Sequence, residues 1–148
     1  MARKITGFTL IEIMVALAVL GVMLAIAVPS YTDWQKERQL TSDTKMVLSF
    51  VQEERAKAYT TKQNIQLNVA NGTTSICDGM GNCVNTEHAL EATSTNISIS
   101  SRGVYDNEHI RIQDDTLISE YEPASSCVSL TSTRARVGQY ESGSCNAQ

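Results

Sequence analysis

Apolar residues run almost without interruption from Phe8 to Val28, and the one ionisable side chain in this stretch is Glu12. About 20 such residues allow a helix to span a bilayer. A charge inside such a helix costs several kcal/mol and normally has a partner. The pattern therefore predicts a membrane-spanning helix whose single carboxylate has a partner and a purpose.

The residues before this run predict its orientation. Arg3 and Lys4 precede it, and because positive residues remain on the cytoplasmic side, we expect the C-terminal body outside the cytoplasm. An ordinary secretory signal has an apolar core of about 7 to 15 residues that ends at a small-residue cleavage site. Here the run is longer and the small residue, Gly7, lies before it. These features favour an uncleaved anchor, which leaves Glu12 unexplained.

A second helical pattern follows Pro29 directly. Residues 31–59 contain no Gly or Pro, and apolar side chains recur at intervals of three, four and seven residues, the spacing of one helical stripe. We predict one helix from about Phe8 to Tyr59, bent or loosened at Pro29, whose ring removes a backbone hydrogen bond. The stripe consists of Leu40, Thr44, Val47, Leu48, Val51 and Ala58. The charged residues around it, expected to face water, are Lys36, Glu37, Arg38, Asp43, Lys45, Glu53, Glu54 and Lys57.

Alternating apolar and polar residues predict strands in the rest of the chain. Residues 65–69 alternate in this way, and the turn signal Asn71-Gly72 before residues 73–76 predicts a hairpin. Further strands are predicted at 96–100, 109–113, 116–121, 127–132 and 134–140, with 77–83 and 85–95 between them as a loop and a polar stretch. Asp114-Asp115 is expected to form a hairpin turn. The fold class is therefore α+β, a long N-terminal helix packed on an antiparallel sheet.

Four cysteines follow the apolar segment: Cys77, Cys83, Cys127 and Cys145. An even number of cysteines beyond a membrane signal predicts two disulfides in an oxidising compartment. Three pairings exist, and chain order favours the two nearest-neighbour pairs. A zinc site is the rival interpretation, but the spacings of five and seventeen intervening residues fit no familiar ligand pattern.

Composition argues against a broad nucleic-acid-binding surface, and the motifs argue against catalysis. The net charge of −4 and the pI near 5.1 do not suit a broad nucleic-acid-binding surface. His88 and His109 are isolated in the sequence, and each is expected to be an ordinary surface or strand residue. Asp114-Asp115 offers too few oxygen ligands for calcium, and nucleotide-binding glycine patterns are absent from the sequence. We therefore expect a protein that is not an enzyme and uses no cofactor or metal.

Arg134 and Arg136 are one candidate binding site. Alternate residues of a strand point to the same face, so both guanidiniums could reach one nucleic-acid phosphate backbone. The acidic body and the scarcity of nearby lysines instead favour ion pairs between these arginines and glutamates. The glutamates in question are Glu120, Glu122 and Glu141.

The N-terminal stretch "KITGFTLIEIMVALAVLGVMLAIAVPSY" resembles the signature of the type IV pilin superfamily almost throughout. The resemblance implies a basic leader that a prepilin peptidase removes between Gly7 and Phe8, after which the amine of Phe8 is methylated. It implies that Pro29 bends the helix. It also implies that Glu12 meets the amine of a neighbouring subunit during filament assembly, although the amine of its own chain, four residues away, is a competing partner.

The resemblance implies a domain organisation and a location. Residues 1–7 would be the leader, 8–28 the transmembrane half of the helix, 29–60 its amphipathic half, and 61–148 a periplasmic sheet region with two disulfide loops. The protein would be a single-pass inner-membrane protein with a periplasmic body, and part of a pilus or pseudopilus after assembly. Its partners would be other pilins, the peptidase and the inner-membrane assembly platform.

The stretch "SFVQEERAKAYTTKQNIQLNV", Ser49–Val69, resembles the pseudopilin H and FimT/FimU group of minor pilins. That group carries a Gly-Arg-x-Arg segment near its C-terminus, and here "STRARV" has Thr133 in place of the glycine. The implied function is a minor pilin or a type II secretion pseudopilin that helps to initiate assembly. Two alternatives stay open: a minor pilin that binds DNA through Arg134 and Arg136 during uptake, and a major pilin.

Overall fold

The computed structural model describes residues 8–147 and has the expected α+β architecture. The long helix is α1 (Leu10–Thr61), and a short helix, α2 (Asp115–Tyr121), lies between two strands. The strands are β1 (Ile65–Asn68), β2 (Thr73–Asp78), β3 (Cys83–Ala92), β4 (Asn96–Ile99), β5 (Glu108–Ile112), β6 (Cys127–Thr131), β7 (Arg134–Glu141) and β8 (Ser144–Ala147). The chain divides into two compact units, residues 1–35 and residues 36–148, and each is described by itself.

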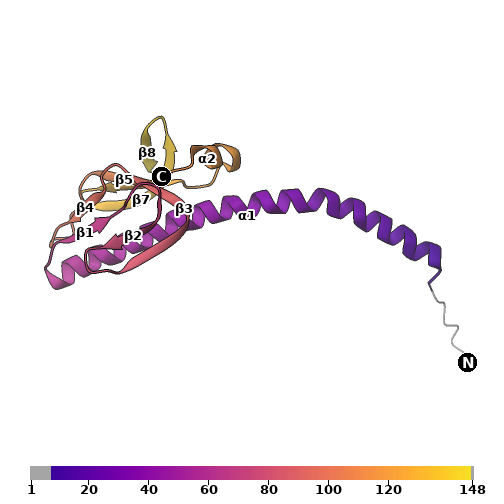
Figure 1. Cartoon of the computed structure of the whole chain (residues 1–148), viewed down its shortest axis with the longest axis horizontal. Coiled ribbons are helices and arrows are strands. Elements are labelled where there is room, and N and C mark those ends of the chain that lie inside the picture. The colour runs from indigo at the N-terminus through magenta and orange to yellow at the C-terminus, as the bar shows by residue number, and fades with distance from the viewer. Residues whose placement is uncertain (1–7, 148) are drawn as a thin grey trace, which may run out of the picture. The chain divides into compact units, whose positions relative to one another are not determined.

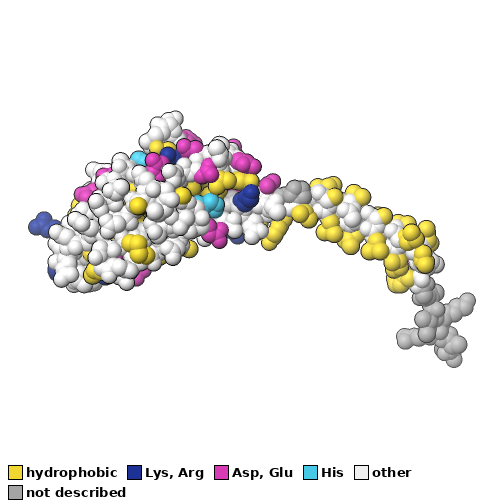
Figure 2. Space-filling model, viewed as in Figure 1, with side chains coloured by type: hydrophobic (Ala, Val, Ile, Leu, Met, Phe, Trp, Pro, Cys, Tyr) yellow, Lys and Arg dark blue, Asp and Glu magenta, His cyan; other side chains and the backbone are white. Residues whose placement is uncertain are grey.

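The N-terminal unit is an exposed apolar helix. The described residues contain one helix that is long and apolar enough to cross a membrane, and its most apolar part is not buried by the protein. Figure 2 shows hydrophobic side chains along its length. Thr9 precedes the helix, and its carbonyl and hydroxyl oxygens accept hydrogen bonds from the Glu12 N–H at 3.1 and 3.3 Å. α1 is helical on both sides of Pro29, whose side chain lies outside the described positions.

The second unit packs the C-terminal part of α1 against an eight-stranded sheet of order β4-β1-β2-β3-β5-β6-β7-β8. Every pair of neighbouring strands is antiparallel. In Figure 1 the strands lie along one side of this part of the helix. The sheet buries alternate residues such as Ile65 and Leu67 on β1, because successive side chains of a strand point to opposite faces.

The predicted helical stripe forms the helix side of the core. Leu40, Val47, Val51 and Ala58 are at most 1% exposed, and Leu48 is partly buried. Aliphatic residues of the sheet cover them: Leu67, Ile97, Ile99, Ile110 and Leu130. The Thr44 hydroxyl, on the same stripe, lies 3.1 Å from the Leu40 carbonyl oxygen and 3.2 Å from that of Ser125. The stripe prediction is therefore confirmed.

Two of the charged residues predicted to face water are instead buried. Asp43 is 3% exposed and Glu54 is 2% exposed. Asp43 is bound by the backbone of β3, and Glu54 lies beside Lys57, one helical turn away. The prediction was wrong at these positions because a helical pattern does not reveal which other elements cover its polar residues. Here β3 covers Asp43.

Residues 116–121 form the helix α2, so the predicted strand and the predicted turn at Asp114-Asp115 are wrong. The Asp114 carboxylate accepts hydrogen bonds from the N–H groups of Thr116 and Leu117 at 3.0 and 3.3 Å, which is the geometry of a helix N-cap. Glu122 ends the helix in the left-handed conformation, with φ +42°. None of the residues of α2 is buried, so its alternation does not mark a core-facing strand.

Two strands lie where none was predicted. β3 covers most of the polar stretch 85–95 and pairs with both β2 and β5. Its buried side chains, Thr86, Leu90 and Ala92, are spaced by four and two residues, because β3 shifts register against β2. β8 is a mostly exposed edge strand that pairs with β7. Neither strand shows regular alternation, the signal that the sequence prediction used.

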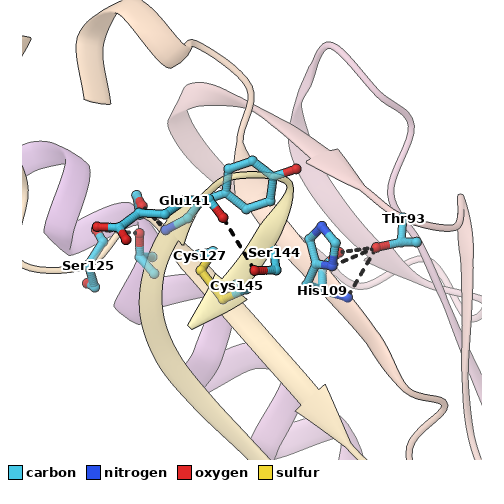
Figure 3. The surroundings of a disulfide bond; sticks show 10 residues. Thr93, His109, Ser125, Cys127, Glu141, Ser144 and Cys145 are labelled. Carbon is cyan, nitrogen blue, oxygen red and sulfur yellow. Dashed lines mark hydrogen bonds between the residues drawn. A yellow bond between two sulfur atoms is a disulfide. The ribbon is translucent and has the colours of Figure 1, made fainter. Parts of the chain in front are cut away.

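Both disulfides connect nearest neighbours in the chain. Cys77 and Cys83 are opposite each other on β2 and β3, with Cα atoms 4.1 Å apart. Cys127 on β6 is bonded to Cys145 on β8, across the intervening strand β7. Figure 3 shows this second bond with Ser144 beside it, and the Ser144 hydroxyl donates to the Glu141 carbonyl oxygen at 3.3 Å.

The pairing gives a first testable expectation. A denatured, unreduced fragment that begins near Gln35 should not react with a thiol reagent, and reduction should release four thiols. Each bond should contribute about 2 to 4 kcal/mol to the free energy of unfolding by restricting the unfolded chain. Peptide mapping checks the pairing: labelled cysteine before reduction, or a peptide that joins Cys83 to Cys127, would contradict it.

Candidate functional site: the helix N-terminus and two charged grooves

The residues predicted to act in assembly lie at the start of α1. Phe8 is 79% exposed, and Glu12 is exposed in the first turn of the helix. The Glu12 carboxylate forms no hydrogen bond or ion pair with any other described residue. The predicted cleavage residue Gly7 lies outside the described residues. The helix N-terminus favours a nearby negative charge, and the carboxylate remains accessible to a partner outside the chain.

His88 is a strand residue of β3, as predicted, and it also contacts a buried carboxylate of α1. Its Nδ1 lies 2.8 Å from a carboxylate oxygen of Asp43, and its backbone N–H donates to the same oxygen at 3.0 Å. The N–H of Glu87 also donates to Asp43, at 3.2 Å. These bonds hold α1 to β3. His109 has a smaller role, since its Nδ1 lies 2.9 Å from the hydroxyl of Thr93, as Figure 3 shows.

A buried carboxylate, Asp78, connects α1 to the first disulfide loop. One of its oxygens accepts hydrogen bonds from Lys57 Nζ and the Asn82 side chain, both at 2.7 Å. The other accepts the N–H groups of Met80 and Asn82 at 2.9 and 2.7 Å. Burial raises the pKa of Asp78, but these hydrogen bonds outweigh it and hold the pKa well below its usual range. Asp78 therefore acts as a structural anion.

Four arginines line a groove of about 570 Å³ between the end of α1 and the start of β7. They are Arg55, Arg102, Arg134 and Arg136. Both predicted arginines are exposed and open into this groove. Within residues 8–147 neither forms an ion pair. The predicted pairing with Glu120, Glu122 or Glu141 is therefore wrong, because Glu122 and Glu141 line a different groove.

Two members of this group were not predicted as site residues. Arg55 Nε donates to the Gly103 carbonyl oxygen at 2.8 Å, and its guanidinium carbon lies 5.3 Å from the Tyr105 ring centre. Gly103 has φ +74°, and a Cβ there would approach Arg55 Nε to 3.2 Å, so the residue suits a glycine in both respects. Arg102 precedes it and is exposed. Nothing in the local sequence links Arg102 to β7, and the fold alone brings them together.

A second groove, of about 660 Å³, lies between α2 and the β7–β8 hairpin. Asp115, Glu122 and Glu141 line it, and no Lys or Arg does so among the described residues. Arg111 lies nearby, but it pairs with Glu91 at 2.5 Å and with Asp115, and its guanidinium stacks on Tyr140. The carboxylates of Glu122 and Glu141 form no ion pair with another described residue.

The described residues contain no group of three His, Cys, Asp or Glu side chains placed to hold a metal ion. Three charged features of the described surface remain as candidate binding sites: the Glu12 carboxylate, the arginine groove and the acidic groove.

Comparisons with known proteins concern the N-terminus. Residues 2–28 match the family model described as the prokaryotic N-terminal methylation motif. The fimbrial protein of Pseudomonas aeruginosa is 49% identical over 35 residues, which are 24% of this chain and 23% of that protein. The type IV major alpha-pilin of Moraxella bovis is 49% identical over 35 residues, which are 24% of this chain and 22% of that protein. No solved structure matches the chain.

The matched segment spans less than a quarter of each of these relatives, so it describes the N-terminus and not the globular unit. The methylation motif lies at the expected position, on an apolar helix that can span a membrane. The same helix continues onto an antiparallel sheet. The N-terminal segment is therefore similar to that of type IV pilins, and the helix packed on an antiparallel sheet is consistent with a pilin fold.

Proposed function

We propose that the protein is a minor pilin or a type II secretion pseudopilin, a structural subunit that helps to initiate or extend a filament. The observation that carries the proposal is the exposed apolar helix with a methylation motif and one carboxylate, Glu12, which has no partner among residues 8–147. Glu12 would pair with the Phe8 amine of a neighbouring subunit, because two opposite charges stabilise each other strongly in hydrocarbon. The partners are other pilins, a prepilin peptidase and an inner-membrane assembly platform. The protein has a structural role and is not an enzyme.

Quantitative mass spectrometry of sheared, purified filaments tests this function. A minor subunit should be present in filaments far below the amount of the most abundant pilin. Deletion of its gene should nevertheless reduce the number of filaments or the secretion of substrate. Equal abundance with the principal filament protein would instead identify a major pilin, and absence from filaments would contradict the proposal altogether.

A second candidate function is DNA binding, which the four-arginine groove favours. Guanidiniums bind phosphates bidentately, and several of them along a groove could follow a phosphate backbone. The acidic chain, with a formal net charge of −4, opposes this function.

The prediction for this candidate is specific. If the groove binds DNA, replacing Arg134 and Arg136 by alanine should weaken binding by about tenfold or more in low salt, and should flatten its salt dependence by about two phosphate contacts. Electrophoretic mobility shifts with the globular fragment at increasing salt measure both effects. A matched control replaces Lys36 and Lys45, which lie outside the groove. Equal DNA binding by the Arg134 and Arg136 variant would exclude the groove as the DNA site.

A further inference from the structure

The two charged grooves lie at opposite ends of the globular unit. Gln52, Arg55, Ala56 and Tyr59 of α1 line the arginine groove, near the C-terminal end of the helix. The acidic groove is lined by α2, and Tyr121 of α2 accepts a hydrogen bond from Lys36 Nζ at 3.0 Å, near the first residue of the unit. At about 1.5 Å per residue, Lys36 and Arg55 are separated by roughly 28 Å along the helix.

The two ends also differ in charge. Among the described residues the arginine groove has no acidic lining residue, and the acidic groove has no basic one. Figure 2 shows acidic side chains gathered over the part of the unit where α2 lies. Asp115 is partly neutralised by Arg111, whereas Glu122 and Glu141 of this groove form no ion pair with another described residue. Each end thus carries the charges that would complement the other end.

We propose that the arginine groove of one copy binds the acidic rim around Glu122 and Glu141 of a second copy, so that globular units associate head to tail. Different surfaces at opposite ends of one subunit form a heterologous contact, which builds a ring or an open chain and not a two-fold symmetric dimer. Arg134 and Arg136 are exposed and lack intramolecular partners among the described residues, so they can bind carboxylates without first breaking other ion pairs.

The contact rests on the proposed function and refines it. Single exposed ion pairs contribute little to stability, so the contact fixes which surfaces meet and in what register, while the membrane helices supply most of the association. The head-to-tail contact needs two adjacent copies of this chain. The contact therefore places the protein within the shaft, in groups, and not alone at the tip. A nucleic-acid phosphate backbone is the competing occupant of the same groove.

Site-specific photo-crosslinking in cells that assemble filaments tests the contact on the full chain. A photoreactive amino acid is placed at Thr133, next to the arginine groove, and at Asn85 on β3 as a control; both positions are exposed. We expect a crosslinked dimer of this chain from position 133 alone, with residues 115–143 of the second copy as the attachment site. Crosslinks from position 133 only to another protein or to DNA, or no crosslink although the protein is present in filaments, would overturn the proposal.

Charge reversal gives an independent arm. Arg134→Glu with Arg136→Glu, or Glu122→Lys with Glu141→Lys, should each reduce the crosslinked dimer by about tenfold, because like charges then meet. Co-expression of the two variants under different tags should restore it between tags, since the reversed ends complement each other. Failure of this restoration would overturn the proposal. Absence of the wild-type protein from filaments would instead count against the filament function, so the two failures are distinguishable.

Discussion

Glu12→Val should leave the protein in the membrane at its normal level and reduce its amount in filaments by about one to two orders of magnitude. The substitution removes a charge from hydrocarbon, so insertion is unharmed or slightly easier. Leader cleavage should persist, because the scissile bond depends on Gly7 and Phe8. What is lost is the partner of a neighbouring amine, which would remain charged, buried and unpaired. The measurement is the ratio of this protein in sheared filaments to its amount in membranes.

Glu12→Asp is the matched control for this prediction. It keeps the charge but shortens the side chain by one methylene, so incorporation should be intermediate. Wild-type incorporation of Glu12→Val would contradict the role of the carboxylate in recruitment. A subunit at the extreme tip is an exception, because it has no neighbour above it whose amine needs a partner. For such a subunit, a tolerated Glu12→Val substitution with a normal number of filaments would indicate the tip position. The head-to-tail contact predicts that this exception does not apply.

Asp78→Ala should destabilise the globular unit by roughly 2 to 4 kcal/mol. The substitution leaves the N–H groups of Met80 and Asn82 without their acceptor and removes the partner of Lys57. It also removes the contact that Lys57 of α1 makes with the loop closed by Cys77 and Cys83. Urea unfolding of a fragment that begins near Gln35 measures the effect, with the exposed Glu87 replaced by alanine as the control. A loss below 0.5 kcal/mol, the usual limit for surface substitutions, would show that Asp78 is not a structural anion.

The Asp78 carboxylate also makes the free energy of unfolding depend on pH in the acidic range. Because the pKa of Asp78 is lower in the folded protein than its unfolded value of about 3.9, its contribution is complete above that value. The contribution is lost as pH falls below 3.9 towards the folded pKa. Asp78→Asn should therefore lose stability at neutral pH and be less sensitive to acid than the wild type. Parallel stability curves for the two proteins between pH 5 and 2 would contradict this linkage.

Local pattern was enough to predict the long helix, its buried stripe and most strands. Leu40, Val47, Val51 and Ala58 repeat at helical spacing, so their common burial follows from geometry. The prediction for residues 116–121 was wrong because their alternation of apolar and polar residues resembles that of a strand. In the structure Asp114 caps the segment as a helix, and none of the residues of α2 is buried. The strands β3 and β8 were missed because their polar residues do not alternate regularly with apolar ones.

The charged features depend on tertiary structure and were predicted less well. Asp43 and Glu54 have the sequence environment of solvated helix residues, and only the fold buries them. The pair Arg134 and Arg136 was identified from its spacing, but Arg55 and Arg102 join it from segments 32 or more residues away in the chain. The acidic groove likewise combines α2 with the β7–β8 hairpin, two elements that local pattern either mispredicted or missed.

The central claim is that this chain is processed and built into a filament as a pilin-like subunit. The most direct measurement is intact-mass and N-terminal peptide mass spectrometry of the protein recovered from sheared filaments. We predict a chain that begins at Phe8 with a methylated amine and contains two disulfides. Gly7 replaced by a bulky residue should leave the unprocessed form in membranes. Filament-associated protein that retains Met1, or that begins elsewhere than Phe8, would contradict the account.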